Sequence, residues 1–400
     1  MAESVEATGT ARPAASDPSA AGRRLTRALL GLAGLGMALA FFGLLWDHAW
    51  HTTTALDAFW SPPHVLLYSG LALVMLTGLS IFLKPVRDSL AGGLGVRVPF
   101  LSFPVPAPLL LLASGTLVAL LTGMVDQKWH EVLKSAESFY SAPHNFIIVW
   151  AMIAAFGLRS GATVLRGGKE ERSPWAVPVL TAAFVVVFMR LFSSFGDTRA
   201  EYGARLLNPA LSADPNWVAL HRAYLDLDIV ADNTLLAPLV LVAALVTPLA
   251  YAEGLTARRW TATRTAGIFA AQLAVADLAV MAAGYRPLWT SPAVFFILPA
   301  AVAADLAAPK LPRADLRWVV AALVFTGAHG ALYGFHPAGV ALAAAGGWLA
   351  GLSGRGLSDM VDRPTPRRLG WGLLIFGLLF PVLLGGLDIL LRYGTYYWLF

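Results

Sequence analysis

Two stretches of the chain combine a carboxylate, a tryptophan and two histidines at nearly the same spacing. The first contains Asp47, Trp50 and His51, and a Ser-Pro-Pro segment then leads to His64. Because residues four apart lie on one face of a helix, the Asp47 carboxylate and the His51 imidazole would lie together at a helix end. One carboxylate and two imidazoles form a ligand set that suits copper, zinc or non-heme iron. The spacing therefore predicts a metal site built from Asp47, His51 and His64.

The second stretch repeats this pattern later in the chain. It contains Asp126 and His130, and a Ser-Ala-Pro segment then leads to His144. The step along the chain from Asp47 to Asp126 is almost the same as the step from His64 to His144. A nearly fixed offset of this kind indicates a tandem repeat of a two-helix unit. We therefore expect a second metal site built from Asp126, His130 and His144.

Four further residues recur beside these ligands. Asp57 and Glu137 each lie seven residues before the second histidine of their stretch, where a carboxylate can fix the tautomer of a ligand. Solvated loop charges are the alternative for both. Trp50 and Trp129 precede the first histidine of each stretch and fit either an aromatic belt at the membrane surface or the wall of an apolar pocket. For the ligands themselves, the alternative is an Asp–His hydrogen bond at a helix end without a metal.

The composition indicates a membrane protein. The chain has 400 residues, of which 57% are hydrophobic and 13% charged, and its mean hydropathy is +0.65. A soluble domain carries about 25% charged residues. The chain has no cysteine, which excludes disulfides, thiolate metal sites and iron–sulfur clusters. The net charge of +5 comes from dispersed basic residues, which argues against nucleic acid as a partner.

Apolar stretches long enough to cross the bilayer predict an all-α polytopic bundle of about eleven transmembrane helices. We place them at residues 26–46, 63–83, 105–125, 143–159, 174–194, 230–252, 265–284, 291–308, 317–334, 337–353 and 370–391. Lys and Arg gather on alternate loops, and the positive-inside rule then puts the N-terminus in the cytoplasm. This topology places both predicted metal sites at the outer face of a bacterial inner or plasma membrane.

The chain divides into three parts by composition and motif. Residues 1–22 are rich in Ala, Ser, Glu, Thr and Pro and predict a disordered cytoplasmic tail. Residues 23–160 hold the two repeats and form the predicted metal-binding core, and residues 161–400 add further transmembrane helices. The long outer loop at 195–229 carries additional candidate ligands, with a solvated loop as the alternative: Asp197, Glu201, His221 and Asp226.

The two stretches resemble the C subunit of the copper membrane monooxygenases, which include the particulate methane and ammonia monooxygenases. In that subunit an Asp-x-x-Trp-His segment precedes a Pro-x-His at the start of the next helix, which is the order of Asp47, Trp50, His51 and His64 here. The second cluster of the family is similar to the stretch from Asp126 to Trp150, with its Glu-Ser-Phe-Tyr-Ser-Ala-Pro-His segment. The resemblance covers residues 26–160, and it implies one or two copper ions bound by the six ligands named above.

This chain departs from the family pattern in two ways. Asp126 stands where the family often has Asn, and an added carboxylate favours a harder or more oxidised metal at the second site. The family subunit is shorter and works beside two partner subunits, whereas this chain continues through further predicted spans. Those spans could replace the partners, or they could serve a different function on a shared metal-binding core. Partner subunits and a homo-oligomer both remain open.

The resemblance implies a copper-dependent membrane oxidoreductase that activates O2 and oxidises a small apolar substrate entering from the bilayer. Other functions fit the same residues: copper binding or transport without catalysis, an electron-transfer or assembly subunit of a larger complex, and a zinc or iron hydrolase. Soft Cu(I) is generally carried by Cys and Met. The lack of cysteine therefore weighs against copper transport.

Overall fold

Four long apolar helices dominate the structure, which is a computed structural model. It describes residues 19–50, 59–133, 142–165, 242, 246–247, 249–252, 260–284, 296–311, 316–333, 337–362, 365–379 and 382. Within these residues, the helices long and apolar enough to cross a membrane lie in α1 (Ala20–Trp50), α2 (Pro62–Leu79), α4 (Ala107–Leu133) and α5 (Ala142–Leu165). The described part of the chain is all-α apart from one two-stranded hairpin. The fold is therefore that of a helical integral membrane protein.

These four helices coincide with the first four spans predicted from the sequence. A 3-10 turn, η1 (Ser80–Phe82), extends α2 almost to the predicted limit at residue 83. The first helix begins earlier than predicted, at Ala20, because the Ser19 hydroxyl accepts a hydrogen bond from the Gly22 amide at 3.0 Å. A serine in this position satisfies an amide that the first turn of a helix leaves free.

The later predicted spans are covered unevenly. The span 174–194 lies outside the described residues, and 230–252 is described at seven positions only. Helices that overlap the remaining predicted spans are α10 (Thr261–Ala282), α11 (Ile297–Ala307), α12 (Leu316–Tyr333), α13 (Pro337–Asp362), α14 (Pro366–Gly372) and the π-helix η3 (Leu373–Leu379). Of these, α11 and most of α12 are shorter apolar helices. The bundle of eleven spans thus stays a prediction beyond the first four.

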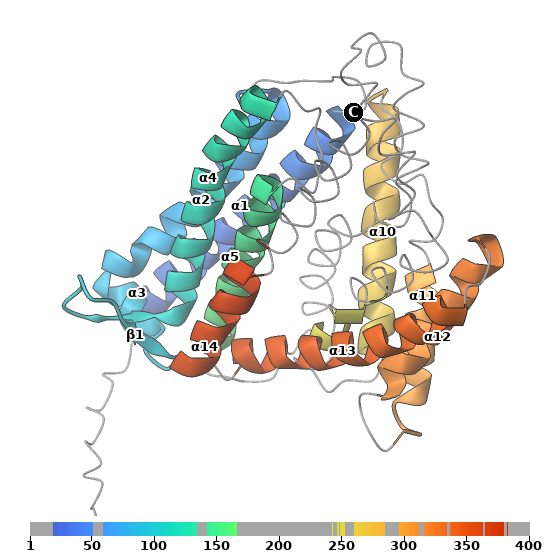
Figure 1. Cartoon of the computed structure of the whole chain (residues 1–400). Coiled ribbons are helices and arrows are strands. Elements are labelled where there is room, and N and C mark those ends of the chain that lie inside the picture. Colours follow the sequence, from blue (N-terminus) through green and yellow to red (C-terminus); the bar gives the residue numbers. More distant parts are fainter. Residues whose placement is uncertain are drawn as a thin grey trace, which may run out of the picture.

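The four long helices lie together on one side of the molecule. Figure 1 shows α1, α2, α4 and α5 side by side, and α2 packs on α4 so that the two helix pairs share one bundle. Large apolar side chains remain exposed along these helices, including Phe42, Leu76 and Leu121. Apolar side chains on the outside of a spanning bundle face lipid tails. Contact with the bilayer therefore follows from the surface of this bundle.

A second core forms between α10, α11, α12 and α13. Trp318 and Phe325 of α12 are fully or almost fully buried there. Asp305 of α11 accepts hydrogen bonds from the amide and the hydroxyl of Thr263, at 2.8 and 2.7 Å. Because Thr263 lies in the first turn of α10, the Asp305 carboxylate satisfies a free amide at the positive end of that helix.

The two helix pairs of the bundle pack through equivalent glycines. A Cβ added at Gly36 of α1 would lie 2.6 Å from the carbonyl oxygen of Gly70 on α2. A Cβ added at Gly115 of α4 would lie 2.6 Å from the carbonyl oxygen of Trp150 on α5. The step from Gly36 to Gly115 equals the step between the two aspartates of the repeat, and the step from Gly70 to Trp150 equals the step from His64 to His144. The sequence repeat is therefore also a repeat in helix packing.

Trp150 also ties the C-terminal part of the chain to the bundle. Its indole Nε1 donates a hydrogen bond to the Gly377 carbonyl oxygen of η3 at 2.8 Å.

We expect Trp150→Phe to destabilise the folded protein by about 1 kcal/mol, because an aromatic ring is kept and one hydrogen bond is lost. Thermal unfolding in detergent measures this effect. Trp348→Phe, at an exposed position on α13, is the matched control, and an equal loss in both variants would contradict the prediction.

Candidate metal centre

Asp47 and His64 meet where α1 ends and α2 begins. The Asp47 Oδ1 and His64 Nε2 atoms are 3.1 Å apart, and the exposed fractions of the two side chains are 7% and 15%. The helix start that brings them together was predicted from the sequence. Ser61 is the N-cap of α2, prolines occupy its first positions, and His64 is its third residue. Two of the three ligands predicted for the first site are thus in contact and mostly shielded from solvent.

The separation of these two side chains fits a shared metal ion. Ligand atoms at about 2.0–2.2 Å from one ion, with angles between about 90° and 110°, lie roughly 2.8–3.6 Å apart. The 3.1 Å distance between Asp47 Oδ1 and His64 Nε2 falls in this range. As a distance alone, it also lies within the range of an imidazole–carboxylate hydrogen bond. The 3.1 Å separation is therefore compatible with two ligands of one ion.

Aromatic rings lie beside His64 and in the last turn of α1. Tyr68, one turn after His64 on α2, has its ring centroid 5.7 Å from that of the imidazole. Phe59 stacks on Tyr68 with centroids 4.8 Å apart and an interplanar angle of 22°. Trp46 and Trp50, in the last turn of α1, pack edge to face with centroids 6.5 Å apart. These contacts place the Tyr68 phenol beside His64, a neighbour that the metal-ligand pattern in the sequence does not predict although Tyr68 lies four residues after His64.

A buried hydroxyl lies at the start of the same helix. Ser61 is 6% exposed, and its Oγ has no hydrogen-bond partner among the described residues. Buried polar groups of folded proteins normally have a partner in the protein, in water or in a ligand. Ser61 lies three residues before His64, so a polar partner for its hydroxyl would sit near the beginning of α2.

The second repeat places its aspartate at the same end of the bundle. Asp126 of α4 is 6% exposed. A Cβ added at Gly123, almost one turn before Asp126, would lie 2.9 Å from the Tyr68 hydroxyl oxygen. Tyr68 therefore reaches from the neighbourhood of His64 to the part of α4 that carries Asp126. Trp129, in the next turn of α4, is half-buried.

Several predicted residues lie outside what the structure describes. The side chains of His130 on α4 and His144 on α5 belong to this group, although the backbone of both helices is described. The others lie outside the described residues altogether: His51, Asp57, Glu137, Asp197, Glu201, His221 and Asp226. Among the side chains that are described, no three His, Cys, Asp or Glu residues gather closely enough to hold a metal ion. Both three-residue sites thus stay predictions, with one of their pairs in contact.

Comparisons with known proteins gave no relative of this chain. No protein-family model matches it, no curated protein matches it, and no solved structure matches it.

Proposed function

We propose that the chain is a copper-dependent membrane oxidoreductase that activates O2 and oxidises a small apolar substrate. The observation that carries this proposal is the contact of Asp47 with His64 at 3.1 Å, with both side chains mostly shielded from solvent. A carboxylate withdrawn from water in a membrane protein is costly and often marks a functional site. Together with a nearby imidazole, such a carboxylate supplies two of the three protein ligands predicted for a copper, iron or zinc ion.

The packing repeat supports a second copy of this arrangement. Asp126 is buried at the same end of the bundle. His144 is the third residue of α5, as His64 is the third residue of α2. The contact points between α1 and α2 recur between α4 and α5 with the same steps along the chain as the aspartates and histidines. Residue 144 therefore occupies the same helix position relative to Asp126 as His64 does relative to Asp47. We infer that Asp126, His130 and His144 form the second site.

The donor set and its surroundings fit copper. Copper with imidazole and carboxylate ligands and an open coordination position supplies the activation of O2. Asp47, His51 and His64 would hold and orient the ion. The rings of Phe59, Tyr68 and the end of α1 would limit the access of water and present an apolar surface to the substrate. The substrate would then arrive through the lipid-facing side of the bundle.

The balanced reaction defines the experiment. A monooxygenase converts RH, O2, two electrons and two protons into ROH and water, so an added quinol must supply the electrons. Copper-loaded protein in lipid nanodiscs is given 18O2, quinol and a short alkane or ammonia, and the product is analysed by mass spectrometry. We expect 18O in the product with the natural chain and a clear loss of it with His64→Ala, which keeps only the second predicted site. Bound copper without 18O incorporation for any substrate would favour the non-catalytic copper-binding alternative.

A further inference from the structure

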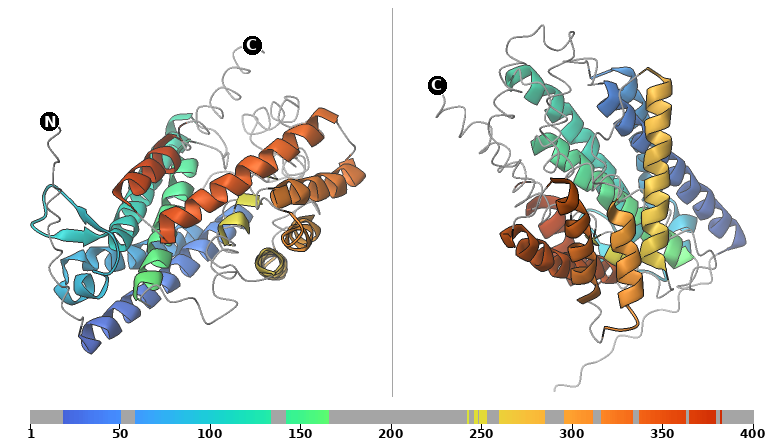
Figure 2. Two further views of the ribbon diagram at one scale, coloured as in Figure 1. Left: turned by 90° about the horizontal axis from the view of Figure 1, so that it is seen from below. Right: turned by 90° about the vertical axis from the view of Figure 1, so that its right-hand side faces the viewer.

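The segment between α2 and α4 forms a small hairpin at the end of the bundle opposite the candidate metal centre. It follows the short helix α3 (Lys84–Ser89) and pairs β1 (Gly95–Arg97) antiparallel with β2 (Pro104–Pro106). Figure 1 and Figure 2 show this teal hairpin projecting sideways beyond the long helices.

The tip of the hairpin is apolar and exposed. Between Arg97 and β2 the chain reads Val-Pro-Phe-Leu-Ser-Phe, without a charged residue. The Leu101 amide donates a hydrogen bond to the Val98 carbonyl oxygen at 3.0 Å, which closes a turn with Phe100 at its outer edge. Phe100 is 92% exposed. Such a large exposed apolar side chain on a turn is a candidate for contact with lipid.

The base of the hairpin holds the tip in a fixed position. Val105 is fully buried, and the Ala107 amide donates to the Leu94 carbonyl oxygen at 2.8 Å. The Arg87 guanidinium lies 3.7 Å from the centroid of the Phe103 ring and donates to the Ile81 carbonyl oxygen at 2.8 Å. The base of the hairpin is therefore packed against the protein, and this packing holds Phe100 at an exposed position.

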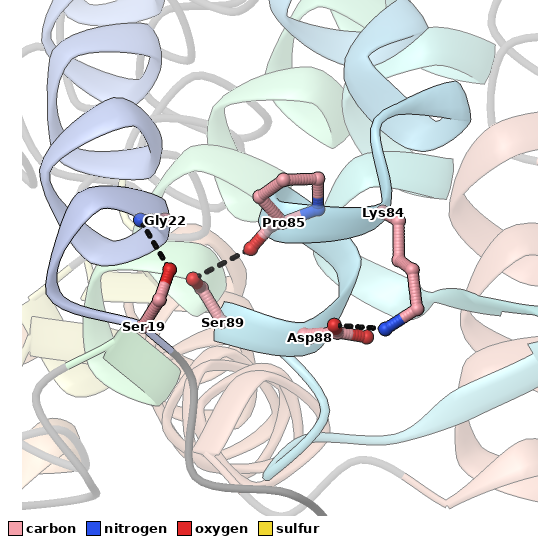
Figure 3. A network of polar contacts seen from close by, with 6 residues as sticks. All are labelled: Ser19, Gly22, Lys84, Pro85, Asp88 and Ser89. Atoms are coloured by element: carbon pink, nitrogen blue, oxygen red, sulfur yellow. Dashed lines mark hydrogen bonds and ion pairs between the residues drawn. The ribbon is translucent and has the colours of Figure 1, made fainter.

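The elements next to this base are rich in basic residues. Figure 3 shows α3 beside the beginning of α1, where Ser19 caps the helix and Lys84 pairs with Asp88 at 2.6 Å. A Cβ added at Gly22 would lie 3.0 Å from the Pro85 carbonyl oxygen, so the two elements are in contact. Within residues 19–40 and 80–106, six residues are basic and Asp88 alone is acidic; the basic ones are Arg23, Arg24, Arg27, Lys84, Arg87 and Arg97.

The surface of the bundle is continuous with the hairpin. Leu76 and Leu79 are exposed on α2, and Phe82 and Leu83 are exposed in the turn that follows it. The next residue is Lys84, and the hairpin begins eleven residues later at Gly95. The lipid-facing stripe of α2 thus leads to a basic segment and then to the exposed Phe100. This order is typical of the boundary between hydrocarbon and headgroups.

We propose that this hairpin is an interfacial anchor that binds the surface of an anionic phospholipid leaflet. The Phe100 tip inserts among the headgroups, and the basic residues at its base face the lipid phosphates. Aromatic and apolar side chains provide insertion, and clustered Lys and Arg provide attraction to anionic lipid. The anchor fixes the depth of α2 and α4 in the membrane and does not depend on the proposed metal chemistry.

The lack of cysteine in the chain allows a clean labelling test. Ser102→Cys places one thiol at an exposed position of the tip, and Gly92→Cys places one at an exposed position with no neighbour within 4 Å. The full chain, carrying an environment-sensitive fluorophore, is reconstituted in nanodiscs with brominated phospholipid. We expect blue-shifted, strongly quenched emission at residue 102 and at least twofold weaker quenching at residue 92.

Two changes then separate insertion from attraction. Phe100→Ser in the Ser102→Cys chain should reverse the blue shift and most of the quenching. In the labelled Ser102→Cys chain, quenching should be stronger in nanodiscs that contain phosphatidylglycerol than in nanodiscs of phosphatidylcholine alone. Adding Lys84→Gln and Arg97→Gln should remove this difference in quenching. Emission typical of water at residue 102, or quenching that Phe100→Ser leaves unchanged, would overturn the proposal. Equal quenching of the labelled Ser102→Cys chain, with no other substitution, in the two lipid compositions would also overturn it.

Discussion

His64→Ala is expected to lower the copper content of the purified protein by about one equivalent, because the substitution removes one of three ligands from the first site. The loss should be large because Asp47, at 3.1 Å from the His64 imidazole, would be left with a single predicted histidine partner. The second repeat keeps all of its predicted ligands and should keep its ion. Elemental analysis by mass spectrometry on protein purified without chelator measures the change.

The control for this experiment is the substitution of another histidine close to Asp47 in the sequence. His48→Ala alters the residue beside Asp47 but none of the predicted ligands, so its copper content should equal that of the natural chain. Asp47→Asn should reproduce the loss seen with His64→Ala, since an amide is a poorer copper ligand than a carboxylate. Equal copper in all four proteins, with unchanged thermal unfolding, would contradict a metal site at the junction of α1 and α2.

Gly36→Ala is expected to destabilise the protein by about 1–3 kcal/mol, which is typical of overpacking a tight interface. The added Cβ would lie 2.6 Å from the Gly70 carbonyl oxygen and 3.0 Å from side-chain atoms of Leu73 and Val74. The first of these contacts is with backbone, so α1 and α2 must move apart. Thermal unfolding in detergent measures the loss, and the shift of α1 should also lower copper retention after dialysis.

Gly34→Ala is a matched control two residues earlier in the same helix. A Cβ at that position meets nothing within 4 Å. Because alanine has a higher helix propensity than glycine, this variant should gain stability, by up to about 1 kcal/mol. The two substitutions are chemically identical, so opposite signs would isolate the helix contact. A loss of similar size in both variants would show that close packing at Gly36 is not the cause.

Much of the four-helix bundle follows from the sequence alone. Length and apolar composition predict the four spans, and Ser61 with the following prolines predicts where α2 begins. The contact of Asp47 with His64 follows from these two facts, because a helix that ends at Trp50 and a helix that starts at Pro62 bring the two residues to the same end of a helical hairpin. The offset of the repeat likewise appears again in the packing of Gly36 and Gly115.

Other features depend on tertiary contacts that a sequence pattern does not carry. The hairpin at 95–106 was missed because Pro104 and Pro106 are unusual in strands, where they cannot donate to a ladder. They are tolerated in β2, a three-residue strand of a two-stranded sheet. The approach of Tyr68 to Gly123 depends on how α2 lies on α4, and the π-helix at Leu373–Leu379 has no signature in its apolar residues.

The most direct test of the proposed function is the metal content of the natural chain, purified without added chelator, together with its electron paramagnetic resonance spectrum. The account predicts between about one and two copper equivalents and a Cu(II) signal with nitrogen hyperfine structure, since imidazoles supply most of the ligands. A protein that binds no metal, even after copper, iron and zinc are offered, would contradict it. The contact between Asp47 and His64 would then be a structural carboxylate–imidazole pair at a helix end.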